Sequence, residues 1–176
     1  NKTLQIFYTK GNEVANIKDV TTVIAGEAGE FFYMDNSGKV FHLKNVEGKQ
    51  PNWQSKVIFD HAQTTLRNDG QPLFLTKAPD GKVVMSTTKG HVFLVDPQNP
   101  KKNGSSGTHY QLPETSEAGK PLVLCEAAAT IDGRSGYAVM REGESAQNAS
   151  YLLYQLYDLS PEPVAVEPAV STQETN

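Results

Sequence analysis

An internal repeat of about fifty residues constrains the fold of this 176-residue chain more than any other feature. Residues 70–75 are Gly-Gln-Pro-Leu-Phe-Leu, and residues 119–124, which lie 49 positions later, are Gly-Lys-Pro-Leu-Val-Leu. A second motif, Gly-x-Val-Phe, occurs at residues 38–41 and again 52 positions later at residues 90–93. Because each copy of a repeat folds as one supersecondary unit, we expect the chain to consist of stacked copies of such a unit.

Every unit carries β-strand patterns separated by turn signals such as Asp80-Gly81 and Lys89-Gly90. Strands are predicted at residues 20–25, 30–34, 39–45 and 55–59 in the first unit, at 72–77, 82–87, 91–96 and 108–112 in the second, and at 121–126, 137–141, 150–159 and 163–166 in the third. No segment has the spacing of an amphipathic helix. The sequence therefore predicts an all-β protein with four antiparallel strands in each unit.

Two further candidate strands, residues 3–9 and 13–17, precede the first unit and are predicted to form half a unit. The predicted boundaries are residues 1–19 for this partial unit or pair of closing strands, 20–68, 69–118 and 119–167 for the three full units, and 168–176 for a polar tail. The sequence starts at Asn1 with no initiator methionine and no signal-peptide pattern, as expected of a processed or excised piece of a larger protein.

The repeated strands, the Gly-x-Val-Phe hairpin and the Asp-Gly turn resemble the blades of β-propellers over residues 20–160. The resemblance is generic, because no Trp-Asp pair or paired cysteine assigns a subfamily. It implies propeller-like blades of four antiparallel strands, about three units plus a partial N-terminal blade. Such a ring closes either when residues 3–17 join the C-terminal strand or when further sequence or another subunit completes it. A twisted β-sandwich built from the same hairpins is the alternative fold.

Composition disfavours two classes of partner. Lysine and arginine number 16 against 20 aspartates and glutamates, which gives a net charge of −4, so the chain has no overall cationic field to attract nucleic acid. Its apolar runs are shorter than the roughly 18 residues that a bilayer-spanning helix requires. We therefore predict neither a nucleic-acid partner nor insertion into a membrane.

The residues that most often carry chemistry do not form a recognisable site. Cys125 is the only cysteine, which excludes an internal disulfide, and its apolar neighbours predict a thiol packed in the core. His42, His61, His91 and His109 lack the spacing of metal ligands. No nucleophile elbow or phosphate-binding glycine loop occurs. The sequence thus predicts no catalytic residue, no metal and no cofactor.

The function that these observations favour is a non-catalytic protein-binding or assembly module, which belongs to a larger protein or complex if the ring is incomplete. In the propeller arrangement that the resemblance implies, the turns between the second and third strands converge on one face. We therefore expect contacts to a protein partner or to further subunits at Asn36, Thr88, Lys89, Arg141 and Glu142.

Trp53 is a sixth candidate, because it stands in a polar stretch that is predicted to be a loop. An exposed tryptophan there would anchor a partner or a sugar, whereas a packed one would cover the hydrophobic layer of its sheet, and the second role is favoured. The alternative function is part of a propeller-type carbohydrate-active hydrolase or lyase, which would make carbohydrate the ligand.

Overall fold

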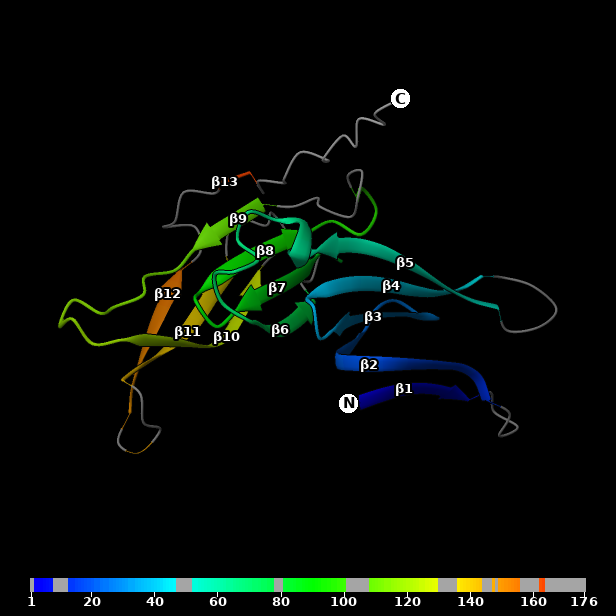
Figure 1. The fold of residues 1–176 in the computed structure, drawn as a ribbon, viewed down its shortest axis with the longest axis horizontal. Helices are drawn as coiled ribbons and strands as arrows, with labels where there is room; N and C mark the ends of the chain where they lie inside the picture. Colours follow the sequence, from blue (N-terminus) through cyan, green and yellow to red (C-terminus); the bar gives the residue numbers. More distant parts are fainter. Residues whose placement is uncertain are drawn as a thin grey trace, which may run out of the picture.

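The computed structural model describes residues 2–7, 13–46, 52–77, 81–100, 108–129, 136–143, 147, 149–155 and 162–163. These residues form three antiparallel β-sheets and one short 3₁₀ helix, η1 (His61–Gln63), and they contain no α-helix (Figure 1). The predicted all-β class is therefore confirmed, and none of the three sheets closes on itself. Within the described ranges, no helix has the length and apolar character needed to cross a bilayer.

The first sheet contains both of the strands that were predicted to form a separate half unit. Its order is β1-β2-β3-β4-β5, with the bounds β1 (Lys2–Phe7), β2 (Glu13–Ala25), β3 (Glu30–Asp35), β4 (Lys39–Val46) and β5 (Asn52–Asp60). Strand β2 runs through the predicted boundary at residue 19, and it pairs with β1 through its first half and with β3 through its second. The predicted half unit is therefore an extension of the first sheet.

The second sheet recruits a strand from the far end of the chain. Its order is β13-β9-β8-β7-β6, with the bounds β6 (Pro72–Lys77), β7 (Val83–Thr87), β8 (His91–Val95), β9 (Thr108–Gln111) and β13 (Glu162–Pro163). In β13, Glu162 pairs with His109 and Pro163 with Thr108. The third sheet has only the strands β10 (Leu122–Ala129), β11 (Gly136–Glu142) and β12 (Ser150–Gln155). The prediction of a fourth strand beside β12 at residues 163–166 is wrong for Pro163, and residues 164–166 lie outside the described ranges.

The repeated glycines make the same turn in the first and second sheets. Gly38 and Gly90 adopt φ values of 78° and 79°, a conformation that glycine reaches without steric cost. The amide of each glycine donates to the carbonyl three residues earlier, at 3.1 Å in both turns. The carbonyl of Gly38 accepts from the amide of His61 at 3.3 Å, and that of Gly90 accepts from Leu112 at 2.9 Å. The predicted hairpins are thus confirmed, and His61 and Leu112 occupy equivalent positions.

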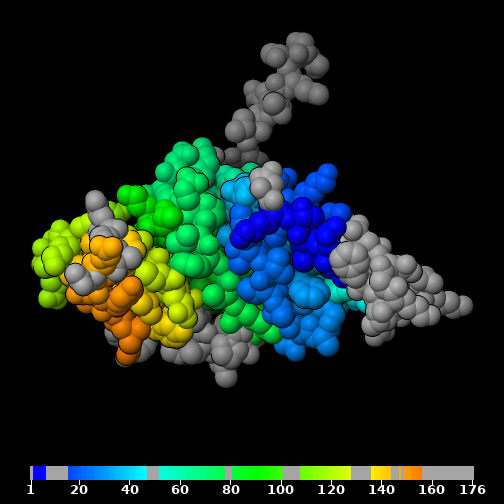
Figure 2. Space-filling view, turned by 90° about the horizontal axis from the view of Figure 1, so that it is seen from below, coloured from blue at the N-terminus to red at the C-terminus, as the bar shows by residue number. Residues whose placement is uncertain are grey.

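The three sheets follow one another along the long axis of the molecule, as the progression from blue through green to orange in Figure 2 shows. One core cluster joins the first and second sheets: Phe32, Met34, Val40, Ile58, Phe59, Leu75, Val83, Met85, Phe93 and Val95. A second cluster joins the second and third: Val84, Val92, Leu94, Tyr110, Leu112, Leu122, Leu124, Ala127, Ala138 and Met140. The middle sheet is therefore covered on both faces, and every residue of β7 and β8 is buried.

Candidate functional site

The predicted turn residues lie on three separate hairpins, one in each sheet. Asn36 is exposed between β3 and β4, and Thr88 and Lys89 are exposed between β7 and β8. Arg141 and Glu142 end β11 and are half-buried. The Nζ of Lys120 lies 3.3 Å from Oε2 of Glu142, and hydrogen bonds from Ser116 and Lys120 lower the pKa of this carboxyl. A binding role for these five turn residues stays a prediction.

Trp53 lies within strand β5, so the prediction of a loop at this position is wrong. Its indole ring is tilted against the ring of Phe31, with the ring centroids 5.6 Å apart. Both rings pack against the outer cluster of the first sheet, which is formed by Val20, Tyr33 and Leu43. This is the covering role that the sequence favoured over an anchor for a partner.

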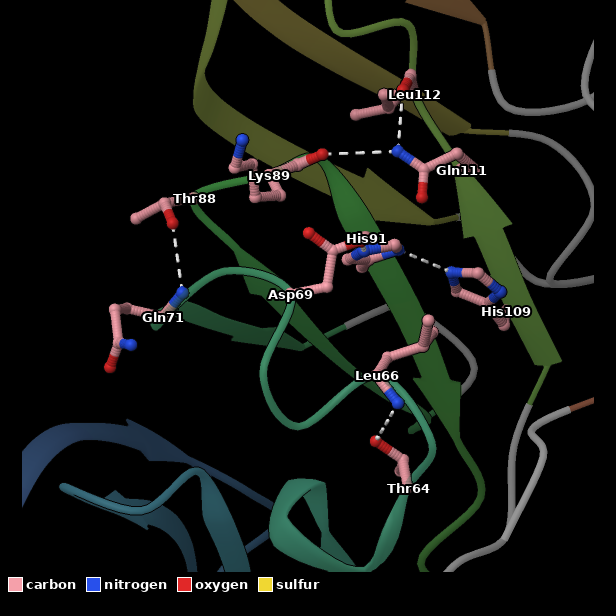
Figure 3. A network of polar contacts seen from close by, with 10 residues as sticks. All are labelled: Thr64, Leu66, Asp69, Gln71, Thr88, Lys89, His91, His109, Gln111 and Leu112. Atoms are coloured by element: carbon pink, nitrogen blue, oxygen red, sulfur yellow. Dashed lines mark hydrogen bonds and ion pairs between the residues drawn. The ribbon is translucent and has the colours of Figure 1, made fainter.

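The sequence did not predict a buried polar network on the face of the middle sheet that meets the first sheet (Figure 3). The imidazole of His91 on β8 lies between a carboxylate and a second imidazole. Its Nε2 is 2.9 Å from Oδ2 of Asp69, and its Nδ1 is 3.0 Å from Nε2 of His109 on β9. Both rings are buried, whereas about half of the Asp69 side chain reaches solvent. The network therefore runs inward from the surface.

The chemistry of the network follows from which atoms hold protons. The Asp69 carboxylate can only accept, so His91 donates to it through Nε2–H. With His91 neutral, its Nδ1 is an acceptor and His109 donates through its own Nε2–H. The inner end of this network, at His109, is not at a pocket that the structure describes.

His61 approaches the same network from the first sheet. Its ring is 2% exposed, its Nε2 has no hydrogen-bond partner, and its centroid lies 5.9 Å from that of Phe93 in an edge-on contact. Burial, assisted by the nearby His91, lowers the pKa of His61 below its ordinary value. A neutral His61 is thus part of the interface between the first two sheets.

The alternation of His91 and Phe93 along one strand could have indicated from sequence that both side chains share a face. Opposing His109 to Phe93 requires the register of β8 against β9, which are separated in sequence by residues 96–107. No local pattern specifies that register, so the contact between His91 and His109 could not be predicted from the sequence. Within the described ranges, no three His, Cys, Asp or Glu side chains are arranged to bind a metal ion.

A pocket of about 310 Å³ lies where the first and second sheets meet, and its walls include Glu27, Glu30, Lys77 and Asp96. A carboxylate pair in one cleft is what the alternative glycosidase function requires. One of the pair must stay protonated to act as a general acid. A hydrogen bond from Lys44, whose Nζ is 2.9 Å from Glu30, lowers the pKa of Glu30. This carboxyl therefore does not suit the acid role.

The outward face of the third sheet is the most exposed apolar surface among the described residues. Tyr151 and Leu153 of β12 are 59% and 65% exposed, and Tyr137 of β11 is 39% exposed. Val139 of β11, which pairs with Leu153, points to the same face. We call these four residues the open face.

The repeat shows that the equivalent surface of the middle sheet is covered. Val84 and Val139 are equivalent by sequence, and the strand pairing places Leu94 opposite the former and Leu153 opposite the latter. Leu94 is 7% exposed because the third sheet packs over it, whereas Leu153 is 65% exposed. The same pairing makes Val92, which is 1% exposed, equivalent to Tyr151.

No protein-family model, curated protein sequence or solved structure matches this chain. The rings of His91 and His109 and the outer cluster of the first sheet are buried. The open face is the apolar surface that remains accessible to a second molecule.

Proposed function

We propose that this chain is a non-catalytic module for protein association, and that its open face binds a protein partner. The observation that carries the proposal is the contrast between Leu94 and Leu153, which occupy equivalent positions and are 7% and 65% exposed. A large exposed apolar patch is costly in water and typically marks an interaction surface. Tyrosine, which supplies two of the four residues, is among the residues enriched in binding hot spots.

We further infer that the three sheets are propeller-like blades of an open segment, so that the partner covers the third sheet as the third sheet covers the second. The support is the common strand meander of the sheets and the contacts of β6 with both β2 and β10. On this interpretation the turn residues Asn36, Thr88, Lys89, Arg141 and Glu142 form a second contact surface on the rim.

The proposal is tested by affinity capture from a lysate of the source organism, with bound proteins quantified by mass spectrometry. The double variant Tyr151→Asp/Leu153→Asp places two charges on the open face, and we expect it to lose the partner that the wild type retains. Val23→Asp is the matched control, because Val23 is 38% exposed on a strand of the first sheet.

A partner retained by the double variant would contradict the proposed surface, and so would equal losses in the double variant and the control. The variant Asn36→Lys/Lys89→Glu, which changes exposed turn residues of the first two sheets, is assayed in parallel. Loss of the partner only in this second variant would move the contact to the hairpin turns. Circular dichroism spectra that match the wild type establish that each variant is folded.

A further inference from the structure

Among the described residues, the third sheet has no counterpart of the fourth repeat strand that both of the other sheets contain. In the first sheet β4 is followed by β5, and in the second β8 is followed by β9. The equivalent strand of the third sheet, β12, stands at the end of the order β10-β11-β12, and no described strand pairs with its outer edge. Within the described part of the chain, the backbone donors and acceptors on this edge of residues 150–155 therefore have no partner strand.

The sequence of β12 has none of the features that protect a free edge. Proteins discourage pairing at sheet edges with charged side chains, especially lysine, and with proline. Each of the other edge strands carries at least one such residue: Lys2 in β1, Lys56 in β5, Pro72 in β6, Glu126 in β10 and Pro163 in β13. Strand β12 is Ser-Tyr-Leu-Leu-Tyr-Gln, which is uncharged and rich in strand-forming residues. Such an edge is suited to pair with another strand.

A groove of about 450 Å³ borders β12. Leu152, Leu153 and Tyr154 of β12 form one wall, and Ser116, Glu117, Ala118 and Glu142 complete its lining. The groove thus lies between β12, the end of β11 and the connection from β9 to β10. Its lining includes two acidic residues, which disfavour an acidic occupant.

We propose that an extended segment of a partner protein adds to β12 as the fourth strand of the third sheet, antiparallel to β12 and lying in this groove. The direction follows the repeat, since β4–β5 and β8–β9 are both antiparallel pairs. Strand addition supplies main-chain hydrogen bonds for affinity and pockets for alternate side chains for selectivity. The inference rests on the proposed association function and specifies how the partner binds.

The repeat also specifies a side chain in the incoming strand. Val40 of β4 faces Phe59, and Val92 of β8 faces Tyr110, so both fourth strands place a buried aromatic ring at this register position. Tyr151 occupies the same position in β12. The partner segment therefore carries an aromatic residue opposite Tyr151, and it is neutral or basic.

The probe is the peptide acetyl-Lys-Thr-His-Tyr-Gln-Leu-Lys-amide, which carries the β9 sequence of residues 108–112 between two lysines. It is titrated into the ¹⁵N-labelled full chain, and we expect saturable amide shifts and slowed hydrogen exchange at residues 150–155. Replacing the tyrosine of the peptide by serine should weaken binding about fivefold, because the cross-strand contact of the ring with Tyr151 is lost. Replacing it by proline should abolish the shifts, since proline cannot continue the ladder.

A protein variant fills the groove without replacing a residue of the open face. Ala118→Trp fills the groove and is expected to abolish peptide binding, whereas Ala28→Trp, at an exposed alanine between β2 and β3, should leave it unchanged. Absent shifts at 150–155, or equal shifts with the proline peptide, would overturn the inference. So would a dimer that protects these amides without peptide, because the edge would then belong to a second copy.

The two proposals fail separately. If capture of a partner depends on Tyr151 and Leu153 but the peptide does not bind, strand addition is wrong and the association function stands. If the peptide binds at 150–155 but the lysate contains no partner that depends on the open face, the edge is a strand-binding site and the proposed association through that face is wrong.

Discussion

His61 makes the stability of the fold depend on pH. Burial lowers its pKa in the folded state, while in the unfolded chain the pKa is about 6.5. The stability that depends on a neutral His61 is thus fully present above about pH 6.5 and decreases as the pH falls below it, by at most about 1.4 kcal/mol per pH unit. We predict that His61→Leu abolishes this part of the acid destabilisation, as measured by urea unfolding at pH 7.5, 6.5 and 5.5.

Leucine is the appropriate replacement because Leu112 occupies the equivalent position in the second sheet, hydrogen-bonded to Gly90 as His61 is to Gly38. The variant leaves the contacts of His91 with Asp69 and His109 in place, so the difference between the two proteins isolates His61. Equal declines of stability in wild type and variant between pH 7.5 and 5.5 would contradict this role.

At the scale of the elements, the turn glycines allow a hairpin to pack closely against the neighbouring strands. A Cβ at Gly38 would lie 2.5 Å from Cγ of Pro72 and 2.9 Å from Cβ of His61, and the residue has φ of 78°. We predict that Gly38→Ala lowers the free energy of unfolding by about 3 kcal/mol, the sum of the backbone strain and the forced repacking. Chemical denaturation at pH 7.5 measures the effect.

Gly81→Ala is the matched control for that substitution. Gly81 has φ of 83°, but a Cβ there would meet no atom within 4 Å. Only the backbone strain remains, so the expected loss is about 1 kcal/mol. Equal losses of stability at the two positions would contradict the predicted steric conflict between a Cβ at Gly38 and the side chains of Pro72 and His61.

The sequence predicted elements well wherever turn and strand signals are local. Strand β6 has the predicted bounds of residues 72–77, and the hairpin at Gly90 follows from glycine's access to positive φ. Partners that are distant in sequence were not predictable. The pairing of Glu162 with His109 depends on the path of the chain after β12, and β2 serves two partner strands across a predicted domain boundary. Local composition contains no information on either choice.

At the scale of the whole molecule, the two ends of the stack differ. On the first sheet, Leu4, Ile6 and Ile17 from β1 and the first half of β2 pack against the outer cluster around Tyr33. The extra strands that precede the repeat thus supply apolar contacts at this end. The third sheet has no equivalent cover among the described residues, and Tyr151 remains 59% exposed. Among the described residues, the exposed apolar surface is therefore larger at the end of the third sheet.

The middle sheet should make unfolding cooperative along the whole stack. It contributes to the core clusters on both of its faces, so neither outer sheet can separate without exposing apolar surface of the middle one. Met85 is fully buried, and we predict that Met85→Ala lowers the free energy of unfolding by about 2–5 kcal/mol.

Two probes measure whether the sheets unfold together. The fluorescence of Trp53 reports the unfolding of the first sheet, and the thiol reactivity of the half-buried Cys125 reports that of the third. In urea, both midpoints should shift together, whereas Gln63→Ala, at an exposed position, should change the stability by less than about 0.5 kcal/mol. A shift of the Trp53 midpoint alone would mean that the sheets unfold independently.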